Sequence, residues 1–260
     1  MERNELSGAV APTDPTREIA IQTDGLRKSY GTVTAVEGLT LTVYRGELFA
    51  LLGVNGAGKT TTIRMLTGLA VPTAGTARVA GYDLKTELQA VKTVSGISPQ
   101  ETAVSEGLTV RENLVTMARI FGKNAEEAAR CADTLIRDFS LEEVASRRAK
   151  LLSGGYQRRL SIAMALVGDP KVLYLDEPTL GLDVLARRQL WKLVEGLKGR
   201  MTVILTTHYL EEAEALSDRV AVMARGRLLA VDTAEGLKAA TGCASFQDAF
   251  IKLVGEEAEA

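Results

Sequence analysis

The sequence lacks several features that would place it in other classes of protein. Its two cysteines, Cys131 and Cys243, lie far apart and form no paired or metal-binding spacing, which predicts free thiols in a reducing compartment. No window approaches the roughly 18 consecutive apolar residues of a membrane-spanning helix. The net charge of -2 gives no overall basic surface, so nucleic acid is not expected as a partner.

The N-terminal segment also lacks the apolar core that a signal peptide needs. It is polar and contains two prolines, so we predict a disordered tail over residues 1–17. The chain of 260 residues is long enough for one large α/β domain with a well-buried core. We assign residues 18–235 to this domain and residues 236–260 to a C-terminal helical appendage. After Gly226 the pattern predicts a small strand and one helix.

The segment Gly53–Thr60 has the sequence GVNGAGKT, which matches the phosphate-binding loop pattern. The apolar run Leu48–Leu52 before it is typical of a buried parallel strand, and the residues after it read as a helix. Glycine leaves room for a polyphosphate to approach the backbone, and the start of the helix contributes its positive dipole end. The alternative is an accidental glycine-rich turn. The predicted strand before the loop and the predicted helix after it favour the phosphate-binding loop. The predicted nucleotide-binding residues are Gly53, Asn55, Gly56, Ala57, Gly58, Lys59, Thr60 and Thr61.

Side chains of this loop have distinct expected roles. Lys59 is expected to bridge the outer two phosphates, Thr60 to ligate Mg²⁺ through its hydroxyl, and Thr61 to reach the innermost phosphate. These assignments predict a nucleoside triphosphate as the ligand. The nucleotide's identity must come from elsewhere in the chain.

Polar residues end three further predicted strands. Asp176 and Glu177 end an apolar strand, where Asp176 is placed to hold Mg²⁺ and Glu177 to polarise an attacking water. A role as turn acids before Pro178 is the alternative. Gln100 follows another strand, at the sheet edge where ligands of α/β proteins collect. His208 follows the predicted strand Met201–Thr207 and is the only histidine. It is placed to hydrogen-bond a terminal phosphate, although a lone histidine is often structural.

The remaining patterns predict two additional layers. Short alternation from Glu18 to Val43 predicts an antiparallel β layer. Tyr30 ends its first strand, where packing and adenine stacking are both open. From Thr109 to Ala149 the apolar period is helical, which predicts a helical lobe over about residues 101–165. Ser153, Gly154 and Gly155 then open a helix and form a second anion-binding terminus, which indicates a site shared between two molecules.

With these segments assembled, residues 19–231 resemble the ATPase subunit of ATP-binding cassette (ABC) transporters. The resemblance is carried by the motifs and their order along the chain. These are Tyr30, Gly53–Thr60, Gln100, the signature segment from Leu152, Asp176 with Glu177, Asp183, and His208.

The resemblance implies that two such domains pair head to tail. Each ATP would then lie between the phosphate loop of one subunit and the serine-glycine segment of the other. It also implies that Glu177 is the general base, His208 the γ-phosphate contact and Asp183 a cross-interface residue. Gln100 would face a membrane partner as well as the metal. The expected sets are Glu177, His208, Lys59 and Gln100 for catalysis, Thr60, Gln100 and Asp176 for Mg²⁺, and Tyr30, Val36, Ser153, Gly154, Gly155 and Asp183 for further nucleotide contacts.

Three positions depart from the family pattern. Tyr156 stands where many members have Gln, Val184 where Pro is frequent, and Val54 where Pro is common. The Ser-Gly-Gly core is intact, so contact with ATP should survive. The segments Leu108–Leu114 and Thr206–Glu214, with the tail near Phe246–Ile251, resemble the ABC-2 exporter type, whose membrane subunit is a separate chain.

We therefore predict an α/β P-loop NTPase core with a mixed sheet, an N-terminal antiparallel β layer and a helical signature-motif lobe. The expected function is ATP hydrolysis with Mg²⁺ that powers a separate multi-pass membrane subunit. The expected partners are this membrane subunit and a second ABC ATPase subunit, and the expected location is the cytoplasmic face of the cell membrane. One alternative is a soluble ABC-type ATPase of an assembly system, such as iron-sulfur cluster assembly. A second is a nucleotide switch that does not hydrolyse ATP.

Overall fold

A computed structural model describes residues 16–259 of the chain. All but the last two residues of the predicted tail, 1–17, lie outside the described residues. The β-strands are β1 Ile19–Tyr30, β2 Val33–Tyr44, β3 Leu48–Gly53, β4 Ala74–Val79, β5 Tyr82–Asp83, β6 Ser95–Ser98, β7 Val172–Asp176, β8 Thr202–Thr207, β9 Arg219–Ala224 and β10 Arg227–Asp232. The α-helices are α1 Lys59–Leu66, α2 Leu88–Val94, α3 Val110–Ile120, α4 Ala125–Asp138, α5 Gly154–Leu166, α6 Val184–Glu195, α7 Leu210–Leu216, α8 Ala234–Thr241 and α9 Phe246–Glu259, with short 3-10 turns at Glu142–Val144 and Ala149–Leu151.

The larger sheet is mixed, as predicted, with the strand order β10-β9-β3-β8-β7-β6. The pairs from β9 through β6 are parallel, and only β10 pairs antiparallel with its neighbour. In this register Leu52 pairs with Thr207, and Asp176 pairs with Thr206. The carboxyl ends of β3, β7 and β8 therefore meet at one edge of the sheet, which is where ligands bind in α/β folds.

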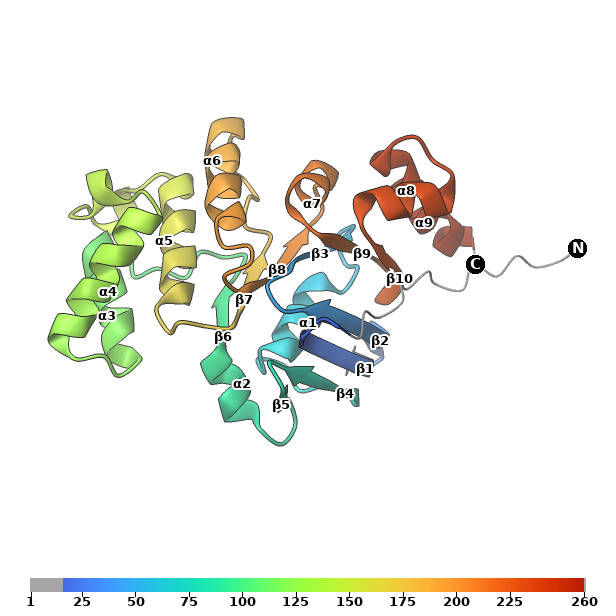
Figure 1. Ribbon diagram of the computed structural model, residues 1–260, viewed down its shortest axis with the longest axis horizontal. Helices are drawn as coiled ribbons and strands as arrows, with labels where there is room; N and C mark the ends of the chain where they lie inside the picture. Colours follow the sequence, from blue (N-terminus) through green and yellow to red (C-terminus); the bar gives the residue numbers. More distant parts are fainter. Residues whose placement is uncertain (1–15, 260) are drawn as a thin grey trace, which may run out of the picture.

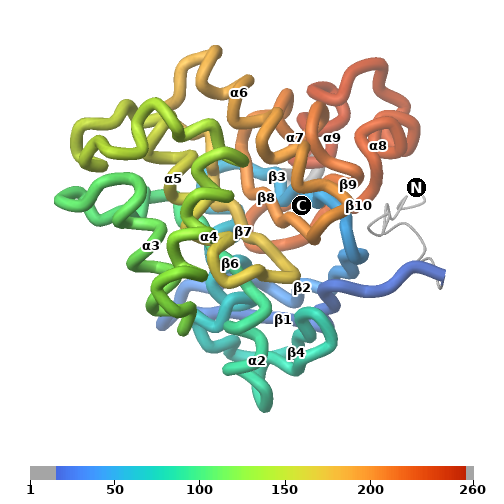
Figure 2. The backbone as a smooth tube through the Cα atoms, turned by 60° about the vertical axis from the view of Figure 1, so that its left-hand side comes forward, coloured from blue at the N-terminus to red at the C-terminus, as the bar shows by residue number. Residues whose placement is uncertain are grey.

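The smaller sheet confirms the predicted antiparallel layer. Its order is β2-β1-β4-β5, with every pair antiparallel. In Figure 2 these strands lie below the larger sheet. The core between the two sheets contains Ile21 and Leu39 from the small sheet, Ile63 from α1 and Phe49 from β3, all fully buried.

Strand β3 shows why the sequence reads as an unbroken apolar run. All six of its residues are buried. Phe49 and Leu51 face the core shared with the small sheet, whereas Leu48 packs in the core of the helical lobe and Ala50 in the C-terminal core. A strand covered on both faces needs apolar side chains at every position.

Helices α3, α4 and α5 form the lobe at one end of the molecule in Figure 1. Two of them begin at capping boxes: Thr109 and Glu112 exchange hydrogen bonds at the start of α3, and Asn124 and Glu127 do so for α4. Such reciprocal bonds satisfy amide groups that have no partner within the helix. The predicted apolar stripe lies on α4, whose buried residues include Ala128 and Ile136.

The C-terminal segment differs from the expected strand and single helix. Strand β10 is followed by two helices, α8 and α9, at the opposite end of the molecule from the lobe (Figure 1). Gly242 ends α8 in the left-handed conformation with φ 69°, a position that favours glycine. Leu237 and Phe246 are buried against β9 and β10, so these helices pack on the edge of the larger sheet.

Tyr174 in β7 places a hydroxyl group in the apolar core. Its side chain is fully buried and its hydroxyl has no hydrogen-bond partner among the described residues. Burial raises the pKa of Tyr174, and the nearby Ser95 hydroxyl opposes this rise without meeting hydrogen-bond geometry. An unpaired buried hydroxyl is unfavourable because it has lost its contact with water.

We expect Tyr174→Phe to raise the free energy of unfolding by about 0.5–2 kcal/mol, because it removes an unpaired hydroxyl. The neighbouring control, Leu173→Ala, should lower it by about 2–5 kcal/mol by leaving a cavity. Urea denaturation followed by circular dichroism measures both. A Tyr174→Phe protein less stable than the wild type would show that the hydroxyl is satisfied in the folded state.

Candidate functional site

The phosphate-binding loop connects β3 to α1, as its pattern predicts. Gly56 and Gly58 have φ 81° and 99°, a region that residues with a side chain rarely adopt. A Cβ atom added at Gly58 would lie 2.6 Å from the Ala35 carbonyl oxygen, and one at Gly53 would lie 2.3 Å from that of Met223. The loop therefore depends on glycine for its own packing as well as for access to a ligand.

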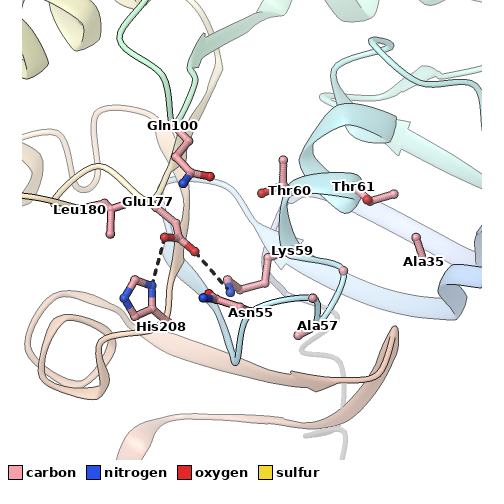
Figure 3. Close-up of a pocket in the computed structure, with 12 residues that line it drawn as sticks. Ala35, Asn55, Ala57, Lys59, Thr60, Thr61, Gln100, Glu177, Leu180 and His208 are labelled. Carbon is pink, nitrogen blue, oxygen red and sulfur yellow. Dashed lines mark hydrogen bonds and ion pairs between the residues drawn. The ribbon is translucent and has the colours of Figure 1, made fainter.

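A cavity of about 480 Å³ opens over this loop. Figure 3 shows side chains from three directions pointing into it: Lys59 from the loop, Gln100 from the segment after β6, and Glu177 with His208 from the ends of β7 and β8. The lining residues are Ala35, Asn55, Gly56, Ala57, Gly58, Lys59, Thr60, Thr61, Gln100, Glu177, Leu180 and His208.

Lys59 is held inside the loop and is only 4% exposed. Its Nζ donates to the carbonyl oxygens of Gly53 at 2.8 Å and Val54 at 3.2 Å. It also lies 3.5 Å from Glu177 Oε1. A buried ammonium group needs such partners to offset its loss of hydration, and it places a positive charge at the base of the cavity.

Glu177 links the loop to His208. Its Oε2 lies 3.0 Å from His208 Nδ1 while its Oε1 faces Lys59 (Figure 3). The backbone of Glu177 has φ 45°, a left-handed conformation that is strained for a residue other than glycine. Strain of this kind persists where surrounding contacts enforce it, and it is frequent at functional sites.

Asp176 is held by two hydroxyl groups. Thr206 Oγ1 donates to its Oδ1 at 2.6 Å, and Thr60 Oγ1 lies 3.1 Å from the same oxygen. Thr206 Oγ1 also accepts from the backbone amide of Glu177 at 3.0 Å. One buried hydroxyl therefore orients both acids at the end of β7.

The oxygen donors around Asp176 suit a hard cation. A carboxylate, the Thr60 hydroxyl and the amide oxygen of Gln100 are the ligand types that Mg²⁺ prefers. The Thr60 and Asp176 oxygens are already in contact, and the Gln100 side chain points toward Thr60 in Figure 3. These residues fit the predicted Mg²⁺ site.

Gln100 is placed by Arg158 of α5. The two guanidinium nitrogens of Arg158 donate to the carbonyl oxygens of Pro99 and Gln100, each at 2.6 Å. Arg158 is 4% exposed, and burial lowers its pKa while the charge of Asp176 opposes that shift. The start of the signature helix and the Gln100 segment are thus directly connected.

Several predicted nucleotide contacts do not line the cavity. Tyr30 is 47% exposed with the Lys28 ammonium over its ring, and Val36 is fully buried against Gly58. Ser153 lies at the start of α5 and Asp183 at the start of α6, where Asp183 accepts two backbone amides. Within one chain these residues, together with Gly154 and Gly155, do not line the cavity over the loop.

Sequence reasoning did not include three residues that shape the site. Ala35 and Leu180 line the cavity, and Thr206 holds the two acids. No motif marks Ala35 or Leu180. Thr206 had a usable signal, because a second polar residue, Thr207, follows it at the end of an apolar strand.

A glycine-rich loop between a strand and a helix, with a buried lysine and two acids at the end of another strand of the same sheet, defines a P-loop nucleoside triphosphatase. Comparison with known proteins identifies the family within this class. The family described as "ABC transporter" matches residues 36–180, more than half of the chain, and the chain belongs to this family.

Two curated relatives are similar over most of their length. The daunorubicin/doxorubicin resistance ATP-binding protein DrrA of Streptomyces peucetius is 47% identical over 231 residues, which cover 88% of this chain and 69% of that protein. The Nod factor export ATP-binding protein I of Paraburkholderia xenovorans is 45% identical over 228 residues, which cover 87% and 75%. A solved structure of an ATP-binding subunit of an ABC transporter superposes with a TM-score of 0.80 at 31% identity, covering 90% of this chain and 99% of that one.

The chain is accordingly an ATP-binding and ATP-hydrolysing subunit of a transporter complex. The predicted fold class, the resemblance to the ABC transporter ATPases and the ATPase activity are confirmed. Within residues 16–259, none of the helices combines the length and apolar character needed to cross a membrane.

The Thr206 contacts yield a second prediction. Thr206→Val keeps the side-chain shape but removes one of the two hydroxyl contacts of Asp176 and the side-chain acceptor of the Glu177 amide, so we expect it to lower the free energy of unfolding by about 1–3 kcal/mol. It should also reduce ATP turnover, because the acids lose their orientation. Thr206→Ser retains the hydroxyl and is the matched control. Equal stability and turnover of the two variants would contradict the role given to this hydroxyl.

Proposed function

We propose that this chain hydrolyses ATP to drive export by a separate, multi-pass membrane subunit. The observation that carries the proposal is the contact of Glu177 with both Lys59 and His208 at the mouth of the phosphate-binding loop. Export is supported by the two relatives, whose names describe drug resistance and Nod factor export. Family membership in the ABC transporters favours this function over the assembly ATPase.

In this proposal the loop and Lys59 bind the phosphates of ATP. Backbone amide groups of the loop and of the start of α1 would donate to the anion, as expected for a loop that opens a helix. Lys59 would exchange its contacts with loop carbonyl groups for contacts with the outer phosphates. Tyr30 and Val36 are assigned to the adenine side, where the half-exposed ring of Tyr30, which the Lys28 ammonium contacts, would stack on the base.

Thr60, Asp176 and Gln100 would hold Mg²⁺. When bound, the ion would neutralise charge on the outer phosphates of ATP. Two further residues would hold these ligands in place. Thr206 orients Asp176, and Arg158 binds the backbone carbonyl oxygen of Gln100.

Glu177 is the proposed general base. Its carboxylate would accept the proton of the water that attacks the γ-phosphorus, while His208 orients Glu177 through Nδ1 and contacts the γ-phosphate. Lys59 and the loop amides would stabilise the charge that develops on the transferred group. An ion-paired, strained Glu177 suits this role because its position is enforced by the residues around it.

A second ABC ATPase subunit is proposed to complete each site. The Ser153 side chain makes no capping bond to its own helix, so its hydroxyl is available to a phosphate on the partner. Beside Asp183, the apolar side chains of Val184 and Leu185 are 64% and 73% exposed. Exposed apolar groups next to a predicted cross-interface residue are typical of a contact surface.

The proposed subunit works at the cytoplasmic face of the cell membrane, held there by its membrane partner. Gln100 is assigned to relay the state of the site to that partner. Nucleic acid is not proposed as a partner. The division into an ATPase domain over residues 18–235, with a helical lobe at about 101–165, and a C-terminal appendage over 236–260 is part of the same proposal.

Glu177→Gln tests the assignment of the base. The amide cannot accept the proton from water, so we expect ATP turnover to fall about 10²–10⁴-fold. ATP affinity should be retained, because the loop and Lys59 are unchanged. Phosphate release and equilibrium nucleotide binding measure the two effects. Turnover near the wild-type rate would refute this role for Glu177.

Ser153→Arg tests the shared site. A bulky cation at the start of α5 should block closure on the partner's ATP, so the Glu177→Gln protein with Mg²⁺ and ATP should sediment as a dimer, and the double variant as a monomer. Ser146→Arg, at an exposed position of the same lobe, is the matched control and should leave the dimer intact. If the Glu177→Gln protein stays monomeric with the membrane partner present as well, the shared site is wrong.

A further inference from the structure

A buried carboxyl group without an assigned role lies four residues beyond His208. Glu212 of α7 is 0% exposed. Trp191 of α6 donates its indole N–H to Glu212 Oε1 at 2.9 Å. The second oxygen, Oε2, is buried and has no hydrogen-bond partner among the described residues. Buried polar atoms of this kind are rare in native proteins and need an explanation.

Neutral hydroxyl groups surround this carboxyl group. Burial raises the pKa of Glu212, and the hydroxyls of Thr207 and Thr179, the Trp191 indole and the charge of Arg187 oppose the rise. Thr179 Oγ1 is itself buried without a hydrogen-bond partner. A protonated carboxyl group donates one hydrogen bond, so Glu212 Oε2 and Thr179 Oγ1 are a matched donor and acceptor.

The neighbours of Glu212 belong to segments of the candidate site. Thr179 follows Glu177 by two residues, and the amide of Leu180 donates to the Glu177 carbonyl oxygen at 3.2 Å. Thr207 directly precedes His208, and its Oγ1 accepts from the Tyr209 amide at 3.0 Å. One carboxyl group therefore reaches the segments on both sides of the Glu177–His208 pair.

Helix α6 joins the same cluster through Arg187. Its guanidinium group lies 4.5 Å from the centre of the Tyr209 ring, and that ring lies 4.2 Å from the ring of His208. Trp191, on the same helix, holds Glu212 directly. The helix that begins at Asp183 is thus connected to His208 by two routes, and both pass through the surroundings of α7.

We propose that Glu212 is a positioning residue for ATP hydrolysis. Its side chain is hydrogen-bonded to helix α6 through Trp191 and lies beside Thr179, in the turn after Glu177, and Thr207, before His208. In this position it would support the contact between Glu177 and His208 that Figure 3 shows. The inference rests on the proposed function of that pair. Glu177 has a strained backbone, and strain is maintained only where neighbouring contacts enforce it.

Two variants of Glu212 separate hydrogen bonding from shape. Glu212→Gln can still accept from Trp191 and donate to Thr179, so we expect a kcat within about threefold of the wild type. Glu212→Leu has a similar volume but no polar atoms, and we expect its kcat to fall at least about tenfold with the KM for ATP within about threefold. Glu214→Leu, at an exposed position of the same helix, is the control for effects on α7 itself.

The chain has a single tryptophan, so its fluorescence reports on this bond directly. Loss of the hydrogen bond from Trp191 to Glu212 should shift the emission of the Glu212→Leu protein to shorter wavelength. Glu212→Gln should emit like the wild type. An emission shift without any fall in kcat would show that the bond is structural only, and would overturn the proposal.

The pH dependence of stability gives a second readout. A raised pKa in the folded state means that the wild type loses stability as pH rises from about 4.5 through the folded pKa. Glu212→Gln does not titrate, so its melting temperature should exceed that of the wild type at high pH, and the difference should shrink toward pH 4.5. Arg187 is the charged group that acts on Glu212, and repeating the comparison in an Arg187→Gln background isolates the carboxyl group.

Thr179→Val covers the case in which Glu212→Leu fails to fold. It removes only the hydroxyl, and we expect a fall in kcat that is smaller than that of Glu212→Leu, because only one of the groups around Glu212 is lost. Glu177→Gln distinguishes failure of the proposed ATPase mechanism from failure of the positioning role of Glu212. If it remains active, the proposed function itself fails; if it is inactive while folded Glu212→Leu and Thr179→Val keep the wild-type kcat, only the positioning role fails.

Discussion

The parallel register of β3, β7 and β8 is the constraint on which the rest of the structure depends. Because Leu52 pairs with Thr207 and Asp176 with Thr206, the phosphate-binding loop, the two acids and the histidine begin at one level of the sheet. Side chains that are distant in the sequence, such as Lys59, Glu177 and His208, therefore lie close enough to contact one another. The same register requires strands buried on both faces, which accounts for the apolar run in β3 and for the three cores to which its residues contribute.

Polar groups at this edge are buried and are held by one another. Lys59 contacts two loop carbonyl oxygens and Glu177, and Thr206 contacts Asp176 and the Glu177 backbone. In surroundings of low polarity each contact is strong, and each unpaired atom is costly. Such a network suits a site that must stabilise charge on a phosphoryl group, since its dipoles are oriented before the ligand arrives.

Local patterns predicted much of the fold because their physical causes are local. Alternation over residues 18–43 identified the small sheet, and the apolar stripe from Ala128 to Phe139 identified α4. The C-terminal segment shows the limit of this approach. Gly242 divides the expected helix into α8 and α9, and a glycine in a helical pattern does not by itself indicate whether the chain will turn there. The outcome depends on the packing of Leu237 and Phe246 against the sheet.

The sequence by itself determined the chemistry that is available: a glycine-rich loop, a lysine, two acids and a histidine, each at the end of a strand or the start of a helix. That much follows from local conformation and residue type. Only the tertiary structure decided which of these groups meet. The pairing of Glu177 with His208, the hold of Thr206 on Asp176 and the burial of Glu212 among Trp191 and two threonines all depend on strand order and helix packing, and these are set by contacts between residues far apart in the chain.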